Sequence, residues 1–429
     1  MQLVAYGAQD IYLTGNPQIT FFKTIYKRHT NFSMEHIQQT FQGNPGPGAR
    51  VVATVSRNGD LIHDCYIKLN INCISGGEED DQAVLNPGHN ILNNIELEIG
   101  GQLIDRQYGH FMEAHAELTE ESNGYFSGDP NTYYGADLSL FYGNTNELNV
   151  QNISPFQLTS GAGGILVPRG SLVTDDTDIA NLYVPLRFWF CRHIGLSLPL
   201  IALQYHEVNI NITFSNIYPL INVYEEPELW VNYIYLDTDE RRRFAQLSHE
   251  YLIEQVQTQE FSWTEQTGSD QRLKLNFNHP VKELIWGVTQ DNTLYDGWGG
   301  VFGGSFSTFH HTSSGGHVDT KCKLILNGQD RFDEQDIDYF TRYQPYKYHK
   351  NLSLTIKTDT IGVYSFALRP EEHQPSGTCN FSRIDFAVFE IKSAGGYVGT
   401  PITTVLQMYA INYNVLRIMS GMGGLAYSN

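Results

Sequence analysis

The chain has 429 residues and a formal net charge of −20, with 47 Asp and Glu against 27 Lys and Arg. This balance argues against a protein that coats nucleic acid, because such proteins bind phosphates with an excess of basic side chains. The length exceeds what one hydrophobic core usually supports, so we expect two domains of about 200 residues each. The 13% aromatic content and the 39 glycines favour β-structure with many turns.

Neither a membrane span nor a disulfide framework is predicted. The densest apolar stretch, residues 196–203, is far shorter than a spanning helix and is interrupted by Pro199. The first ten residues lack the basic and apolar regions of a secretory signal. The five cysteines are scattered and odd in number. We therefore expect reduced, buried thiols in a protein that folds in a cytosol-like compartment.

The first half of the chain is predicted to be an arm followed by short strands. Residues 1–25 are polar and aromatic without a clear period, which is typical of an arm lying against another surface. In the strand-rich part that follows, residues 43–48 form a loop and Asn58-Gly59 favours a hairpin turn. Residues 108–118 have the apolar spacing of a short helix.

Residues 124–178, rich in Gly, Asn, Ser, Asp and Tyr, are predicted to be long surface loops. A connection between domains is expected over residues 218–227, which include Pro219 and Pro227. A short helix could begin within residues 238–243, with Thr238 or Asp239 as its N-terminal cap. Strands then resume, interrupted by glycine-rich loops at 298–304 and 312–316, and the chain ends in a long strand over 405–419.

The chain also contains an internal repeat. In both residues 95–102 and residues 322–329, three alternating apolar side chains precede a turn, at an offset of 328 − 101 = 227 residues. Phe111-Met112 and Tyr339-Phe340 follow the two turns. Residues 28–37 match 243–252 at an offset of 215, and a loop at residues 57–62 matches one at 278–281.

The last pair of matching segments, which begin at Pro199 and Pro375, gives an offset of 176 residues. The difference between the offsets, 227 − 176 = 51, predicts 51 extra residues in the first copy between Met112 and Pro199. The predicted fold is all-β, with two tandem eight-stranded antiparallel jelly-roll sandwiches and short helices in the loops. The predicted divisions are an arm at 1–25, a first jelly roll at 26–217 and a second at 218–429.

No catalytic, cofactor-binding or metal site is predicted. Two glycine motifs bind phosphates after a strand, Gly-x-x-x-x-Gly-Lys-Ser/Thr and Gly-x-Gly-x-x-Gly, and neither occurs here. His310, His311, His317 and Asp319 lack the second close pair of ligands that zinc sites usually have. His110 and His115, five residues apart, do not share a helical face.

Other candidate sites also fail. The thiol and imidazole in Cys191-Arg192-His193 would point to opposite faces of an expected strand. The acidic runs 78–81, 175–178 and 371–372 are interpreted as solvated loops, because glycosidase chemistry needs carboxyls facing across a cleft. A structural or binding role therefore fits this sequence better than catalysis.

Several segments resemble the major capsid proteins of the nucleocytoplasmic large DNA viruses, especially those of algal viruses. They are residues 3–10 and 16–23 at the start, 237–244 in the middle, and 370–383 and 412–418 near the end. The segment 370–383, Pro-Glu-Glu-His-Gln-Pro-Ser-Gly-Thr-Cys-Asn-Phe-Ser-Arg, is the most specific.

The resemblance implies a double jelly roll that forms pseudo-hexagonal homotrimers, which tile an icosahedral shell assembled in the host cytoplasm. It implies minor capsid proteins and a penton protein as partners, an underlying viral membrane nearby, and no cofactor. A carbohydrate- or receptor-binding jelly roll remains the alternative, with a β-sandwich glycosidase more distant. Within 370–383 we expect an ion pair between Arg383 and Glu371 or Glu372.

Overall fold

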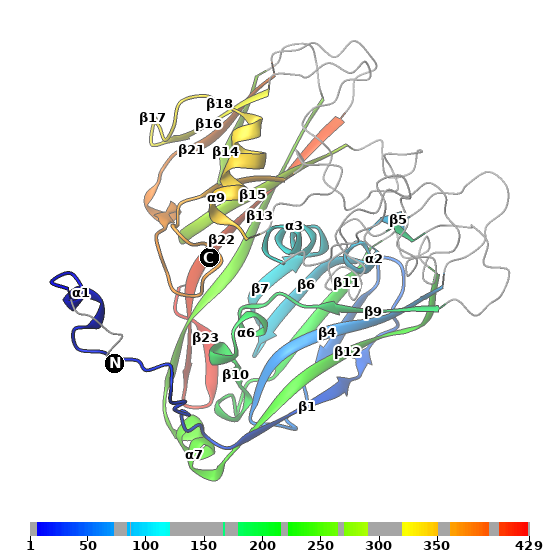
Figure 1. Cartoon of the computed structure of the whole chain (residues 1–429). Helices are drawn as coiled ribbons and strands as arrows, with labels where there is room; N and C mark the ends of the chain where they lie inside the picture. The colour runs from blue at the N-terminus through cyan, green and yellow to red at the C-terminus, as the bar shows by residue number, and fades with distance from the viewer. Residues whose placement is uncertain are drawn as a thin grey trace, which may run out of the picture.

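The computed structural model describes residues 7–72, 84–85, 87–120, 166–167, 179–215, 222–264, 270–290, 320–350, 361–393 and 403–427. In this part of the chain the strands form four large antiparallel sheets, which pair into two sandwiches lying side by side (Figure 1).

The first sandwich is built from residues on both sides of its long loops. One sheet has the order β1 (Phe32–Gln39), β12 (Asn222–Leu236), β4 (Leu61–Asn72), with β9 (Ile179–Pro185) and β10 (Leu198–Pro199) along the free edge of β4. The other has the order β2 (Phe41–Gln42), β3 (Arg50–Thr54), β11 (Val208–Phe214), β6 (Leu92–Ile99), β7 (Gln102–Tyr108). A separate short pair joins β5 (Val84–Leu85) to β8 (Leu166–Val167). The chain crosses repeatedly between the two main sheets, for example from β3 to β4 and from β11 to β12, as in a jelly roll.

The second sandwich repeats this order. One sheet runs β13 (His249–Thr264), β22 (Thr403–Met419), β15 (Pro280–Gln290), β19 (Ile361–Ser365), with β20 (Cys379–Asn380) on β15 and β23 (Met422–Leu425) on β22. The other runs β14 (Gln271–Leu275), β21 (Ala387–Ser393), β16 (Thr320–Leu326), β17 (Gln329–Asp330), with β18 (Gln335–Asp336) also on β16. The predicted double jelly-roll fold is confirmed.

In the part of the chain that the structure describes, short helices lie in the N-terminal arm and in the connections between strands. They are α1 (Ile11–Thr14), α2 (Pro87–Asn90), α3 (Gly109–Thr119), α6 (Trp189–Arg192), α7 (Thr238–Gln246) and α9 (Gln344–Tyr348), the 3-10 helices η1 (Ile194–Leu196), η2 (Leu200–Ala202) and η6 (Phe381–Arg383), and the π-helix η5 (Tyr339–Tyr343). The helix predicted over 108–118 is confirmed as α3. None of the helices in the described part of the chain is both long and apolar enough to cross a membrane.

The repeat is confirmed, but one of its predicted registers is wrong. Leu97 on β6 pairs with Ile210 on β11, and Leu324 on β16 pairs with Phe389 on β21. Leu97 and Leu324 keep the offset of 227, whereas Ile210 and Phe389 give 389 − 210 = 179 instead of 176. The first copy therefore carries 227 − 179 = 48 extra residues, not 51. The error arose because β21 is buried at every position from Ala387 to Ile391. Apolar and polar residues therefore do not alternate along this strand, and its register cannot be read from such alternation.

The predicted boundary between 217 and 218 is also wrong. It assigns β12 to the second jelly roll, but β12 pairs with β1 and β4 of the first. Glu225 and Glu228 flank irregular register in this strand, and Pro227 between them is tolerated at such bulges. The chain passes between the sandwiches at α7, where the Asp237 side chain accepts from the backbone N–H of Thr238 (2.7 Å). The predicted helix is therefore present, capped one residue earlier than expected.

The predicted turns have mixed outcomes. Residues 43–48 do connect two paired strands, β2 and β3. Asn58-Gly59 is not a hairpin turn, because β3 and β4 on either side of it belong to different sheets. It carries the chain across the sandwich instead. The extra loops at 124–178 fall almost entirely outside the described residues, as do 298–304 and 312–316.

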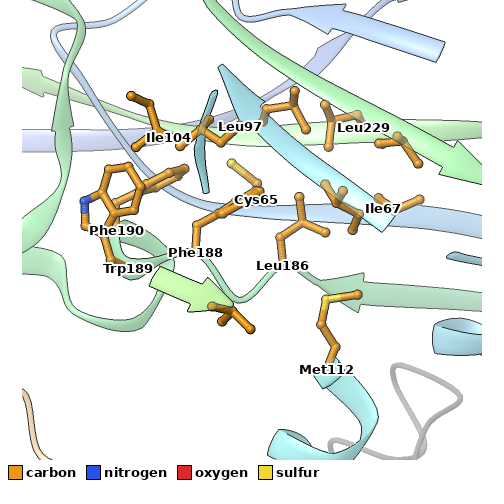
Figure 2. Close-up of a cluster of buried hydrophobic side chains, with 14 of the residues drawn as sticks. Cys65, Ile67, Leu97, Ile104, Met112, Leu186, Phe188, Trp189, Phe190 and Leu229 are labelled. Carbon is orange, nitrogen blue, oxygen red and sulfur yellow. The ribbon is translucent and has the colours of Figure 1, made fainter. Parts of the chain in front are cut away.

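Two hydrophobic clusters hold the fold together. In the first, Ile67 and Leu229 of one sheet face Leu97 of the other, with Phe188 and Trp189 closing the end near α6 (Figure 2). In the second, Trp286 packs with its ring centroid 5.0 Å from Phe389 and 5.5 Å from Phe340. The first cluster does not end at its own sandwich. It continues into β15 and β22 of the second, so the two sandwiches share one apolar contact.

Candidate functional site: the junction between the two sandwiches

The junction joins β7, α3 and α6 of the first sandwich to β13, β15 and β22 of the second (Figure 1). Its apolar centre is Tyr409 of β22, which is 1% exposed. The Tyr409 ring lies 5.4 Å from Phe111 and 6.1 Å from Tyr108, measured between ring centroids. The Tyr409 hydroxyl lies 3.2 Å from Nδ1 of His110. Burial raises the pKa of Tyr409 and lowers the pKa of His110 to about 4, so both side chains are neutral at pH 7.

Asp105 of β7 ties the two sandwiches through the backbone. Its Oδ1 accepts from the backbone N–H of Val256 on β13 (3.1 Å). Beside it, the Gln255 side chain donates to the carbonyl oxygen of Ile104. Burial raises the pKa of Asp105 to about 6, although the Val256 N–H opposes that rise. A carboxylate is thus used where two sheets meet and a backbone donor would otherwise be unsatisfied.

A buried charged group crosses the same junction. Glu254 of β13 contacts Nη1 of Arg192 from the first sandwich at 2.7 Å and Nζ of Lys282 from the second at 2.8 Å. Lys282 also donates to the carbonyl oxygen of Pro370 (2.7 Å). Burial raises the pKa of Glu254, but the two cations outweigh it and hold that pKa below its usual range. Glu254 is therefore ionised and bridges the two sandwiches.

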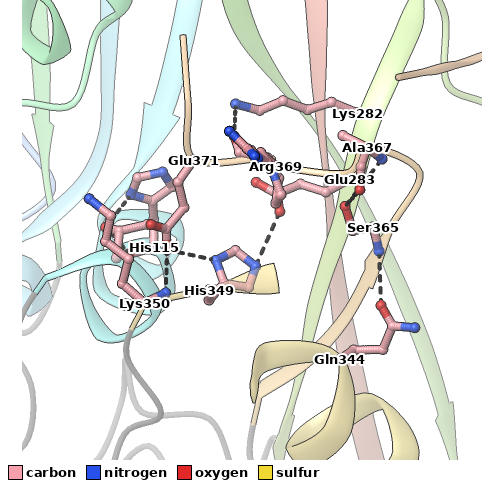
Figure 3. Close-up of polar contacts among 12 residues, drawn as sticks. His115, Lys282, Glu283, Gln344, His349, Lys350, Ser365, Ala367, Arg369 and Glu371 are labelled. Atoms are coloured by element: carbon pink, nitrogen blue, oxygen red, sulfur yellow. Dashed lines mark hydrogen bonds and ion pairs between the residues drawn. The ribbon is translucent and has the colours of Figure 1, made fainter. Parts of the chain in front are cut away.

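A second charged group is centred on His349, just after α9 (Figure 3). Its Nε2 lies 3.2 Å from Glu283 and its Nδ1 lies 3.2 Å from Glu371. Glu371 also accepts from the backbone N–H of Lys350 (2.9 Å). Burial lowers the pKa of His349, but the two carboxylates outweigh it and raise the value to about 9. The side chain is therefore an imidazolium at neutral pH. The pKa of His115 on α3 is lowered mainly by burial, and the nearby positive charge of His349 lowers it further.

The ion pair predicted for Arg383 is wrong. Glu371 pairs with His349, and Glu372 pairs with Arg369 at 3.2 Å. The interpretation of Glu371 as a solvated loop residue is wrong for the same reason, because its side chain is only 11% exposed. The spacing of residues 369–383 carried no signal for these pairings, since His349 reaches Glu371 from a separate segment.

The other candidate residues are accounted for as follows. Cys191 lies on α6 rather than on the expected strand, and its hydrogen bond to Cys65 raises the pKa of that buried thiol. His193 stacks on His373 across the junction, with ring centroids 5.1 Å apart. In the part of the chain that the structure describes, no three His, Cys, Asp or Glu side chains are grouped to hold a metal ion. His310, His311, His317, Asp319 and the acidic runs 78–81 and 175–178 lie outside the described residues.

Two jelly rolls in one chain, joined by a buried apolar and charged contact, define the class of double jelly-roll proteins. The model of the major capsid protein N-terminus matches residues 20–237. The family model of the large eukaryotic DNA virus major capsid protein matches residues 240–424. The two matches meet at α7, where the structure places the boundary.

The chain belongs to the major capsid protein family of the large eukaryotic DNA viruses. It is 42% identical to a major capsid protein of Pyramimonas orientalis virus, over 100% of this chain and 99% of that protein. It is 39% identical to a major capsid protein of Paramecium bursaria Chlorella virus 1, again over 100% and 99%. A quasi-atomic model of the PBCV-1 virus capsid superposes with a TM-score of 0.68 at 34% identity, covering 96% of this chain and 100% of that one. This chain is a structural component of the virion capsid.

Proposed function

We propose that this capsid protein assembles as a homotrimer of pseudo-hexagonal outline, and that these trimers tile the icosahedral shell. The observation that carries the proposal is the repeated sheet order, β1-β12-β4 in one sandwich and β13-β22-β15 in the other. Three chains supply six similar sandwiches, so a closed threefold ring can occupy a sixfold position in a lattice. The 48 extra residues of the first copy would make alternate corners of that hexagon differ.

We infer that the chain has a structural role and no enzymatic activity. The relatives that share its full length are named as capsid proteins. The buried acids of the junction are engaged with partners in the same chain, as Glu254 is with Arg192 and Lys282. Their perturbed pKa values therefore have a structural explanation.

We also propose a role for the N-terminal arm, residues 1–25. In the described part of the arm, Tyr12, Phe21 and Phe22 are 89%, 86% and 98% exposed, and α1 projects away from both sandwiches (Figure 1). Aromatic side chains left this exposed favour contact with another surface. The proposed partners are minor capsid proteins on the inner side of the shell, near the viral membrane. A penton protein would close the vertices, and assembly would take place in the host cytoplasm.

The decisive measurement is the solution mass of the purified protein, combined with low-resolution imaging. We expect a species of three times the 48.6 kDa chain mass with a pseudo-hexagonal outline. A chain that remained monomeric under assembly conditions would contradict the trimer. Deleting residues 1–25 should leave the trimer intact and abolish co-assembly with minor capsid proteins. Unchanged co-assembly would rule out the proposed role of the arm.

A further inference from the structure

Two cysteines that are far apart in the sequence meet where α6 packs on β4. Cys65 of β4 belongs to the first hydrophobic cluster and is 1% exposed, and Cys191 of α6 is half-buried against the same cluster. Figure 2 shows Cys65 among the residues that lead into α6, Phe188 and Trp189. The two thiols are free and are hydrogen-bonded to each other.

Hydrogen bonds on both sides of this contact hold α6 against β4. The backbone N–H of Leu186 donates to the carbonyl oxygen of Cys65 (2.9 Å). Two residues before Cys65, Nδ1 of His63 lies 2.6 Å from the carbonyl oxygen of Phe190, the residue that precedes Cys191. The two cysteines are therefore fixed opposite each other by their neighbours. Their sulfur atoms are already in contact, which is the first requirement for a disulfide bond.

The two thiols differ in how a small reagent can reach them. The hydrogen bond with Cys191, and after it burial, raises the pKa of Cys65, so this thiol stays protonated at neutral pH. A buried, protonated thiol reacts slowly with a reagent from solution, because the thiolate is the nucleophile. Cys191 is partly open to solvent, so a small oxidant meets Cys191 first. Cys65 then lies next to it as the second thiol.

We propose that Cys65 and Cys191 form a disulfide bond that fastens α6 to β4 when the capsid leaves the reducing interior of the host and meets hydrogen peroxide. The thiolate of Cys191 attacks one oxygen of the peroxide, the O–O bond breaks and hydroxide leaves, so the sulfur becomes a sulfenic acid. The sulfur of Cys65 then attacks this sulfur and the S–O bond breaks. The leaving hydroxide takes the Cys65 proton and departs as water.

The step is balanced and does not depend on the proposed trimer. Two thiols are oxidised to one disulfide, and one peroxide is reduced to two waters, the first of which takes up the proton of the Cys191 thiol. Only the timing of the bond, after release of the virion, rests on the proposed assembly in the host cytoplasm. The chemistry itself needs one folded chain.

The bond would stabilise the first sandwich and its junction with the second. It closes a loop that spans 191 − 65 = 126 positions of the chain. A cross-link across a long loop stabilises a protein mainly by restricting its unfolded state. The helix that it fastens also carries Arg192, whose guanidinium contacts Glu254 of the second sandwich at 2.7 Å. Holding α6 in place therefore holds one side of the charged junction.

The cysteines of the second sandwich provide an internal control. Burial alone raises the pKa of Cys322 on β16, and burial is the main cause at Cys379 on β20, which is half-buried as Cys191 is. Within the described residues, neither of them is held against a second thiol. Both should therefore stay reduced under conditions in which Cys65 and Cys191 are joined.

Peptide mapping tests the pairing directly. The purified, folded, full-length protein is treated with hydrogen peroxide, denatured with N-ethylmaleimide to block remaining thiols, digested and analysed by mass spectrometry. We expect the peptides of Cys65 and Cys191 to be joined, with two hydrogen atoms fewer than the separate peptides, and to separate on reduction with dithiothreitol. On a non-reducing gel the product should run as a single chain. Maleimide on Cys65 beside a sulfinic acid at Cys191 would overturn the proposal, as would a disulfide from Cys191 to any other cysteine.

Thermal unfolding of matched variants tests what the bond does. Oxidation of the wild type should raise Tm by at least about 5 °C, and dithiothreitol should reverse the rise. Cys191→Ser, a change at a half-buried position, should fold and lack both the disulfide and the rise. Cys379→Ser, at a comparably buried position outside the pair, should keep both. A rise of the same size in Cys191→Ser would refute the assignment, and a disulfide that left Tm unchanged would refute the fastening role.

Discussion

The two sandwiches have the same strand order, yet the corresponding faces of corresponding sheets have opposite environments. In the second sandwich, Tyr409 and Ile285 point away from their own core and are nevertheless buried against α3 and the first core. In the first sandwich, Tyr66 and Tyr183 point outward in the same sense and remain partly exposed. Burial at these positions is thus set by which neighbour lies against the sheet. Shared topology alone does not determine it.

The sharpest way to break this comparison is to truncate one tyrosine on each face. Tyr409→Ala should lower the free energy of unfolding by roughly 3–5 kcal/mol, as for other large aromatic side chains removed from a packed core. Tyr183→Ala should cost less than about 1 kcal/mol, because substitutions of exposed residues have small effects. Denaturant unfolding under monomeric conditions measures both. Equal losses would show that the two faces are equally buried in the isolated chain.

The charged part of the junction should be nearly as sensitive. Glu254→Gln leaves the buried Lys282 and the half-buried Arg192 without their counter-ion, so we expect a loss on the order of 3 kcal/mol. Glu250→Gln on the same strand is the control. Glu250 pairs with Arg417, and their side chains are 59% and 51% exposed. Losing this ion pair should cost no more than about 1 kcal/mol. Equal losses in the two variants would mean that the junction ion pairs behave like surface pairs.

The pH dependence of stability separates the His349 group from the rest of the junction. The folded-state pKa of about 9 lies above the usual 6.5, so the stabilisation is complete below pH 6.5 and is lost as the pH rises towards 9. The loss should be on the order of 3 kcal/mol. His349→Gln should lack this dependence. Unfolding curves between pH 6 and 10 test it, and identical slopes for the two proteins would exclude a charged His349.

The smallest expected effect is at the link between the sandwiches. Asp237→Ala removes the side-chain acceptor at the start of α7 and should cost about 1 kcal/mol. Asp237→Asn should restore most of that stability, because the amide oxygen can accept the same hydrogen bond. Thermal unfolding of the two variants gives the comparison. If Asn is no better than Ala, the carboxylate acts through its charge near the helix N-terminus rather than as a cap.

Local pattern succeeded where a strand has one buried face and ends in a turn. The segment ending at Gly100-Gly101 and its repeat at Asn327-Gly328 were aligned correctly, because alternation and turn residues together fix both register and end. It failed at β21, where both faces are buried and alternation disappears. It failed again at β12, where Glu225, Glu226 and Pro227 suggested a linker but form an irregular part of a paired strand.

The sequence by itself determined the strand-rich double jelly roll, the repeat that relates its halves, and the resemblance to capsid proteins, because these follow from short-range periodicity and from recognisable segments. Only the tertiary structure decided which partners meet across the junction. Arg192 meets Glu254, and His349 meets Glu371, through contacts between segments that the chain brings together only when both sandwiches have formed. No spacing within one strand encodes these contacts. They also decide that the side of the β13-β22-β15 sheet that points away from its own core is buried.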